Sequence, residues 1–299
     1  IPNSIVVNPN LVALGEKLFN EPRMSNNNIS CASCHNYNLA GSDGLKTSKN
    51  IQGGNDLMNT PTIFNVGLNP LLTWFGRNLT LEEQIDKVLA NKKHMDGNWV
   101  DILNRLKKDS SYTKLFNQEF SDGLTRNNVK HAIASFERTL ITPDSPFDNY
   151  LRGDTKAISN NQIEGFKLFK LYGCISCHQG INVGGNLHAK LGTFTSPFKK
   201  DNNTEKSRFN RGLFNLTNDE RDLHVFRVPS LRNVAVTAPY FHSGAIKDLS
   251  KAVKFMAKYQ TGRQISDNDA QLIADFLASL TGQYQGKTII SQYDTKGSL

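Results

Sequence analysis

Two five-residue motifs, Cys31–His35 and Cys174–His178, contain all four cysteines of the chain, and each reads cysteine, two other residues, cysteine, histidine. Two thiols at this spacing can form thioethers with the two vinyl groups of one haem, and the histidine that follows can bind the haem iron. A thioredoxin-like thiol pair, or a structural zinc site made from both pairs, would not explain a histidine directly after each pair. The motifs therefore predict two covalently bound haem c groups. Their attachment and ligand residues are Cys31, Cys34, His35, Cys174, Cys177 and His178.

The predicted cofactor also indicates where the protein works. Covalent haem attachment of this kind implies export, and we expect a periplasmic protein. The first residues, Ile1–Ser4, show no basic segment followed by an apolar one, so we expect that any export signal has been removed from this sequence. The sequence contains no run of about 18 apolar residues, so we expect no membrane-spanning helix.

The charge of the chain allows several classes of partner. There are 35 Lys and Arg residues against 27 Asp and Glu, which gives a formal net charge of +8. Such an excess could favour nucleic acid, an anionic surface or an acidic protein partner. The basic residues are scattered among acids, however, and form no basic stripe interleaved with aromatic residues. We therefore expect no nucleic-acid site, and we favour a solvated basic face over a defined docking patch for an acidic redox partner.

The chain repeats itself, which indicates two haem domains related by duplication. Gly15–Phe19 precedes the first motif as Gly165–Phe169 precedes the second, and Thr60–Val66 is echoed by Val228–Val234. Each of the latter two segments is followed by a glycine and then by an amphipathic pattern typical of a helix. The expected fold is all-α, with two cytochrome c-like haem domains and no extended sheet.

A turn-rich break at Thr142–Pro146 separates the two repeats. It predicts an N-terminal haem domain over residues 1–148 and a C-terminal haem domain over residues 149–299. Apolar periodicity predicts further helices, the last of them after an N-cap candidate at Ser266. These helices cover residues 81–90, 129–140, 246–259 and 267–280.

The repeat also allows the two haem irons to be compared. The twelfth residue after the repeated glycine is Met256 in the second half, counted from Gly244, and Val88 in the first half, counted from Gly76. Methionine sulfur is a good sixth ligand that raises the haem potential, whereas valine cannot bind iron. We therefore expect Met256 to complete a six-coordinate, electron-transferring second haem, and the first haem to be open to a small molecule.

Six further segments give the chain a family resemblance. They are Asn59–Thr62, Trp74–Arg77, Ala134–Leu140, Val228–Val234, Thr237–Gly244 and Leu280–Gly282. Together with the two haem motifs, they resemble bacterial dihaem cytochrome c peroxidases over nearly the whole chain, and Met256 matches that family's axial methionine. The resemblance implies two cytochrome c-like domains with a calcium ion and a tryptophan between them. It also implies that a small monohaem cytochrome c or a copper protein donates electrons at the C-terminal haem, that hydrogen peroxide is reduced to water at the N-terminal haem, and that a homodimer is possible.

Other site residues follow from the same resemblance, position by position. Trp74 matches the tryptophan between the haems, although an ordinary buried aromatic would also pack a domain interface. Asn59, with the backbone carbonyls of Thr237 and Pro239, matches the calcium ligands, and a side-chain carbonyl with main-chain carbonyls suits a hard cation. His242 matches a position near the haem.

The sequence departs from the family at the catalytic acid. The family's glutamine, followed ten residues later by a catalytic glutamate, appears here as Gln84 followed by His94. An imidazole can take a proton from the inner oxygen of peroxide and return it to the outer oxygen as the O–O bond breaks. His94 could instead bind the iron and close the haem to peroxide, or be a solvated loop residue beside Lys92 and Lys93. The pattern leaves these three readings open.

A second departure concerns the resting state of the first haem. Many family members block the peroxidatic iron with a histidine from the loop after the first motif, but no histidine stands between His35 and His94. Such gating is not expected unless His94 or Met58 takes that role. Phe75 also replaces an aspartate that is common in the family.

Two other functions remain: an electron carrier or redox sensor with His94 bound to the first haem, and a relative of the dihaem enzyme that oxidises a tryptophan on another protein. The latter is disfavoured because that enzyme has a tyrosine where this chain has Met256.

Overall fold

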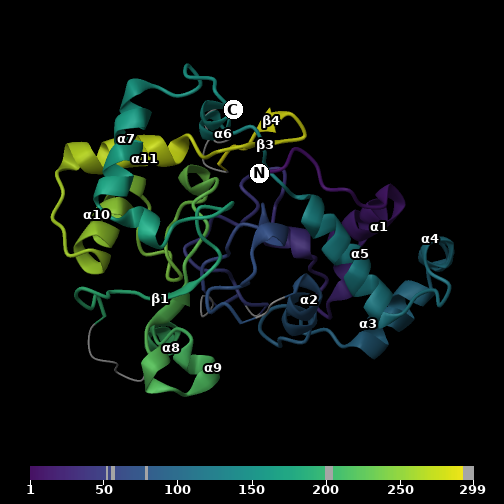
Figure 1. The fold of residues 1–299 in the computed structure, drawn as a ribbon. Coiled ribbons are helices and arrows are strands. Elements are labelled where there is room, and N and C mark those ends of the chain that lie inside the picture. The colour runs from purple at the N-terminus through teal and green to yellow at the C-terminus, as the bar shows by residue number, and fades with distance from the viewer. Residues whose placement is uncertain (52, 55–57, 78–79, 199–204, 292–299) are drawn as a thin grey trace.

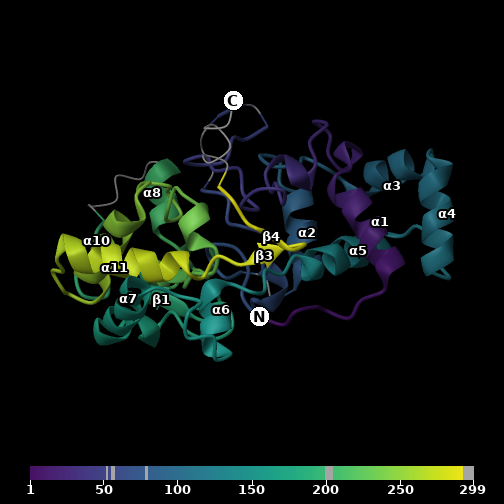
Figure 2. The same ribbon diagram turned by 90° about the horizontal axis from the view of Figure 1, so that it is seen from above.

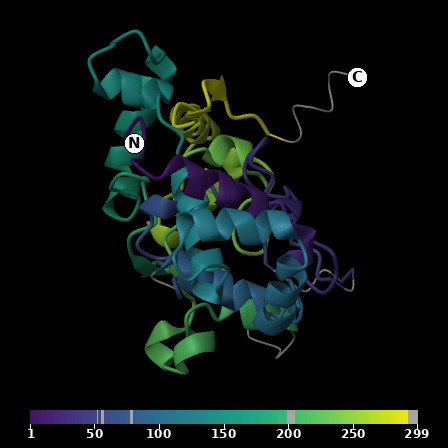
Figure 3. The ribbon, with the colours of Figure 1, turned by 90° about the vertical axis from the view of Figure 1, so that its right-hand side faces the viewer.

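The computed structural model describes residues 1–51, 53–54, 58–77, 80–198 and 205–291. Helices gather at the two ends of an elongated molecule, with loops and a short hairpin between them (Figures 1 and 2). In Figure 3 the first group of helices faces the viewer, so the two lobes follow one another along the long axis. The first lobe contains α1 (Pro9–Phe19), α2 (Leu81–Leu89), α3 (Trp99–Lys107), α4 (Ser110–Glu119) and α5 (Arg126–Thr139). The second contains α6 (Pro146–Leu151), α7 (Asn160–Leu171), α8 (Glu205–Asn210), α9 (Phe214–Thr217), α10 (Leu249–Gln260) and α11 (Asp267–Ala278).

Each lobe is built on one close helix crossing. Helix α1 packs on α5 in the first lobe, and α7 packs on α11 in the second. Both crossings depend on a glycine, because a Cβ at Gly15 would overlap the carbonyl of Ala132 and a Cβ at Gly165 would overlap the carbonyl of Leu272. The duplication predicted from the sequence is therefore a duplication of structure, and the all-α fold with two cytochrome c-like lobes is confirmed.

The first residues of the helices are determined by N-cap residues more closely than by the periodicity of apolar residues. Thr125 accepts a hydrogen bond from the Asn128 amide, so α5 begins three residues before the predicted start. Asp248 caps α10 in the same way, so that helix begins three residues after the predicted start. Ser266 caps α11 as predicted, by accepting from the amide of Asp269.

Two hydrophobic clusters fill the lobes. The first contains buried residues from helices α1, α2, α3, α4 and α5. The second contains Phe147 of α6 together with residues of α7, α10 and α11. The end of the chain returns to the first cluster, where Ile289 is buried and Tyr284 lies 5.2 Å from Phe64 between ring centroids. The division of domains at residue 148 stays a prediction.

A buried polar contact joins the repeats at their boundary. Asn65 and Asn233 occupy matching places in the two halves, and both adopt the left-handed backbone conformation. Each donates through its side-chain amide to the hydroxyl of Thr142, at 2.7 and 3.0 Å. Thr142, in the segment that connects the repeats, therefore binds the equivalent loop in each half.

Strands play a small part in the described ranges. Strand β1 (His188–Lys190) pairs antiparallel with β2 (Val225–Arg227), and β3 (Gln283–Tyr284) pairs with β4 (Lys287–Thr288). The expectation of no extended sheet is met in this part of the chain. None of its helices is both long and apolar enough to cross a membrane.

Candidate functional site

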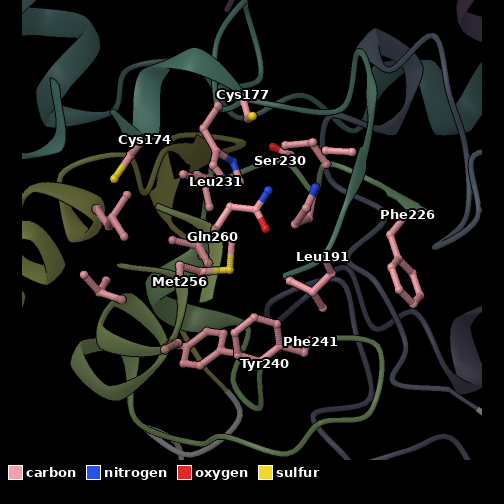
Figure 4. A pocket seen from close by; sticks show the side chains of 18 of the residues that line it. Cys174, Cys177, Leu191, Phe226, Ser230, Leu231, Tyr240, Phe241, Met256 and Gln260 are labelled. Atoms are coloured by element: carbon pink, nitrogen blue, oxygen red, sulfur yellow. The ribbon is translucent and has the colours of Figure 1, made fainter. Parts of the chain in front are cut away.

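The second haem motif lines a cavity of about 760 Å³, the second cavity, whose walls come mainly from the second lobe and partly from residues 59–74 of the first half. Cys174, Cys177 and His178 line it from one side, and helix α10 extends the sulfur of Met256 into it (Figure 4). The sequence motif and the predicted methionine are thus brought to one space, although they are separated by about 80 residues. Cavities of this size are typical of sites for organic cofactors.

Most of the remaining cavity wall is apolar. This suits a flat hydrophobic guest, because such a wall gains free energy when water is replaced by apolar atoms. The apolar lining residues include Phe169, Leu191, Phe226, Val228, Leu231, Ala252, Val253, Ile273 and Leu277.

The two haem motifs share one backbone conformation. In each motif a short 3-10 turn begins at the first cysteine, and the histidine amide donates back to that cysteine's carbonyl. The distance is 2.9 Å from His35 to Cys31 and 3.0 Å from His178 to Cys174. This turn brings the two cysteines and the histidine together within one tight turn of the backbone, as attachment to a single haem requires.

Burial favours the neutral form of both motif histidines. Burial lowers the pKa of His178 to about 4, and the nearby carbonyls of Val183 and Pro229 oppose the shift only in part. Burial also lowers the pKa of His35, whose Nδ1 lies 3.3 Å from the carbonyl oxygen of Gly41. A neutral ring whose Nδ1 faces a carbonyl can offer Nε2 to a metal.

One buried cation faces the cavity with part of its hydrogen-bonding capacity unused. Arg227 is only 6% exposed, and its Nε donates to the carbonyl of Thr73 at 2.7 Å. Its Nη1 is enclosed and has no hydrogen-bond partner among the described residues, and burial lowers its pKa to about 10. A haem propionate is a carboxylate of the kind that would satisfy this guanidinium. The lining residues therefore fit a haem c, with Cys174 and Cys177 as attachment points.

The first motif shares the backbone turn and the buried histidine of the second, which fit a second haem c. Cys31 packs against the first hydrophobic cluster, and burial raises the pKa of its thiol to about 12. Val88, the counterpart of Met256, packs against the same cluster. It offers no atom that could bind iron.

Trp74 lies where the two halves meet. Its Nε1 donates to the carbonyl of Asn59 at 2.8 Å, and its own carbonyl accepts from the amide of Arg227 at 3.0 Å. Its ring also meets the edge of His242, with 6.3 Å between centroids. Trp74 therefore contacts both halves and lines the second cavity.

His242 is a buried member of the cavity wall. It is 4% exposed, stacks on Phe226 with 4.6 Å between centroids, and its Nε2 lies 2.8 Å from Oδ1 of Asn210. Burial lowers the pKa of His242 to about 4, with a smaller contribution from His224. The ring is thus neutral and held in place.

The three predicted calcium ligands line the same cavity beside Trp74. The Nδ2 of Asn59 donates to the carbonyl of Leu45 at 2.9 Å, and its backbone amide donates to the carbonyl of His242 at 2.8 Å. Because Nδ2 is used, Oδ1 is the side-chain atom that remains for a cation. Thr237 and Pro239 come from the loop before α10, so the set joins the two halves.

Gln84 and His94 lie outside the second cavity. Gln84 is in α2, and His94 is in the turn at residues 92–95 that follows it. The next residue, Met95, is 5% exposed and belongs to the first hydrophobic cluster. His94 is itself half-buried, and its role stays a prediction.

Sequence reasoning missed two charged residues of the site. Arg227 directly precedes the repeated segment Val228–Val234, and Glu137 stands inside the segment Ala134–Leu140 that carried the family resemblance. Nothing in the local sequence pattern marks either residue as enclosed. Only the fold shows that Arg227 is buried and that Oε2 of Glu137 is enclosed.

Comparisons with known proteins agree with this geometry. Residues 9–156 match the model of the di-haem cytochrome c peroxidase family. The chain is 42% identical to the cytochrome c peroxidase of Escherichia coli K12, covering 95% of this chain and 61% of that protein. It is 37% identical to the cytochrome c551 peroxidase of Nitrosomonas europaea, covering 92% of this chain and 81% of that protein. A crystal structure of a MauG-like protein associated with microbial copper homeostasis superposes with a TM-score of 0.79 at 25% identity, over 95% of this chain and 94% of the other. The chain thus spans about three fifths of the length of the E. coli relative and about four fifths of the Nitrosomonas protein.

Proposed function

This chain belongs to the di-haem cytochrome c peroxidase family, and from this premise we propose that it reduces hydrogen peroxide to water at its first haem with electrons that enter at its second. Each turnover consumes one peroxide, two electrons and two protons and releases two water molecules. The observation that carries the division of labour is Met256, which extends into the second cavity while its counterpart Val88 packs in the first core. We infer a periplasmic location from the attachment chemistry, and a homodimer is possible.

The second site is assigned to electron entry. His178 and Met256 would hold the iron there, and the bound haem would supply reversible one-electron storage. Leu171 and Ile175, next to the Cys174 attachment, are 67% and 40% exposed. An apolar edge of this kind suits brief contact with a small monohaem cytochrome c or a copper protein, because redox complexes use small interfaces.

Trp74 is assigned to the path between the haems. Its indole N–H is fixed by Asn59 and its ring packs against His242, so it lies in contact with residues of both halves. Because the ring is held by contacts with both halves, it fixes the position of one site relative to the other. A calcium ion bound by Asn59, Thr237 and Pro239 would strengthen that junction, because its oxygen ligands come from both halves.

Gln84 and His94 are assigned to peroxide at the first site. His94 would take the proton from the inner oxygen and return it to the outer oxygen as the O–O bond breaks, with Gln84 orienting the substrate by hydrogen bonding. Histidine is the side chain most often used for such proton transfers. His35 would hold the iron of this haem.

The test compares the intact two-haem protein with His94→Ala and His131→Ala. His131 is exposed and contacts Phe120, so its replacement serves as a matched control. We expect peroxide turnover with a reduced small cytochrome, a high-spin component in the resting spectrum, and a loss of about 100-fold or more in His94→Ala alone.

Two results would change the proposal. Unchanged turnover in His94→Ala would remove His94 from the mechanism. Two low-spin haems in both redox states, without turnover, would support the electron carrier or redox sensor, and a high-spin signal appearing in His94→Ala would then identify His94 as an iron ligand.

A further inference from the structure

Glu137, near the end of α5, is a half-buried residue with an enclosed carboxyl oxygen, and the proposed function gives it no role. Its Oε2 is enclosed and lacks a hydrogen-bond partner in the described part of the chain. Burial raises its pKa to about 8, opposed in part by Arg138 and assisted by Glu82. A carboxyl group with an unused oxygen in an enclosed place is costly, and such groups cluster at functional sites.

The duplication shows what Glu137 faces. The two crossing glycines contact Phe136 on α5 and Phe276 on α11, so these phenylalanines are equivalent. The next residue is Glu137 in the first lobe and Leu277 in the second. Leu277 is 4% exposed and lines the second cavity. Glu137 therefore places a carboxyl group where the other lobe places a leucine against its cofactor space.

A second observation places the same carboxyl group beside the first haem motif. The charge of Glu137 acts on the thiol of Cys31, adding to the effect of burial on that thiol. Cys31 is the first attachment point of the predicted haem. Internal symmetry and electrostatic proximity thus lead independently to one location.

Few other charges face Glu137. On its own helix Arg138 is engaged by Glu82 of α2, with 2.9 Å between Nη2 and Oε1. The segment Val66–Leu68, which also packs on α5, contains no titratable side chain. The charged groups on the facing part of α1 are Glu16, which accepts from Tyr37, and Lys17, which donates to Ser111.

We propose that Glu137 contacts the first haem beside the Cys31 thioether and takes up one proton when that haem is reduced. The iron gains one electron from the donor, and the carboxylate gains one proton from solvent to become a carboxylic acid. Reoxidation reverses both transfers, so the net charge of the site stays constant. The proposal requires haem c at the first motif but does not require peroxide turnover.

The test measures the midpoint potential of the first haem by spectroelectrochemical titration of the two-haem protein across the pH range around about 8. We expect the wild-type potential to fall as pH rises, approaching a tenfold change in the reduction equilibrium per pH unit, which is 59 mV for one electron. Glu137→Gln and Glu137→Leu should lose this dependence at the first haem, and the second haem should be unaffected. Glu164→Gln is the control, because Glu164 is exposed on α7 and pairs with Lys167.

A structural role alone would not change the pH profile of one haem. A wild-type slope that persists in Glu137→Gln with both haems bound would overturn the proposal and assign the proton to another group. Infrared difference spectra of the wild type provide a second measurement that needs no variant. At a pH above about 8, where the oxidised protein carries the carboxylate, reduction should produce the carbonyl band of a protonated carboxyl group, and its absence would also refute the proposal. Failure of peroxide turnover would leave both readouts intact, so the two proposals can fail separately.

Discussion

Replacing Asp148 by asparagine should destabilise the second lobe strongly. Asp148 in α6 forms two parallel hydrogen bonds with Arg232, from Nη1 to Oδ2 and from Nη2 to Oδ1, each 2.8 Å long. Both side chains are 6% exposed. Arg232 also donates through Nε to the carbonyl of Ile181 and lies in the loop 228–234, which supplies Leu231 to the cavity wall. The pair therefore fixes a wall of the haem site as well as stabilising the fold.

The magnitude follows from burial. Removing one partner of a buried ion pair costs about 3–5 kcal/mol, because the remaining charge is left without compensation. At about 2–4 °C per kcal/mol for a domain of this size, the melting temperature should fall by about 6 °C or more. The control is Asp219→Asn, because Asp219 pairs with Arg221 on the surface and should show no measurable change.

The same pair predicts a dependence on pH. Burial would raise the pKa of Asp148, but the hydrogen bonds and the charge of Arg232 outweigh it and hold the pKa below its usual range. A lowered carboxyl pKa contributes stability above the unfolded value of about 3.9, and this contribution is lost as pH falls through the folded pKa. The stability difference between wild type and Asp148→Asn should thus be complete at neutral pH and shrink in acid.

Urea unfolding, followed by far-ultraviolet circular dichroism and by haem absorbance, measures both effects. If Asp148→Asn lowers the free energy of unfolding by less than about 1 kcal/mol at neutral pH, the buried pair contributes no more than a surface ion pair. That result would refute the reasoning. A difference that stays constant down to the acid transition would refute the assignment of the carboxylate as the stabilising species.

Three other changes test the site more directly. Met256→Leu should convert the second haem from low-spin to high-spin at rest and lower its midpoint potential, as absorption and potentiometric titration will show. Arg227→Leu removes a buried positive charge from the second cavity, so the oxidised haem is favoured and the potential of that haem should fall while Met256 ligation persists in the spectrum. Gly165→Ala places a Cβ against the carbonyl of Leu272 and should cost at least about 1–3 kcal/mol in thermal unfolding, with a similar cost for Gly15→Ala in the other lobe.

The sequence was sufficient for features that short spacings determine. Two cysteines and a histidine within five residues predicted each haem attachment, and the repeated segments Gly15–Phe19 and Gly165–Phe169 indicated the duplication. The start of α5 was missed because its first turn, Arg126–Asn128, is polar and only the Thr125 cap marks it. The environment of Arg227 could not be read, because its partner Thr73 is 154 residues away. A charged residue has the same local pattern on a surface and in a cavity wall.

Because the lobes are duplicates, residues at matched positions can be compared directly. The differences at two such positions affect the relative potentials of the two haems in the same direction. Where the second lobe has Met256, the first has Val88, and a methionine ligand raises the potential of the haem it binds. Where the second has Leu277, the first has Glu137, and above its pKa of about 8 the carboxylate favours the oxidised, more positive iron and lowers its potential. On the proposed roles, both differences make the second haem the easier one to reduce. An electron from an external donor would then rest at the second site and reach the first when peroxide or a proton at Glu137 makes that transfer favourable. The asymmetry of function thus requires only a few substitutions at matched positions of one repeated fold.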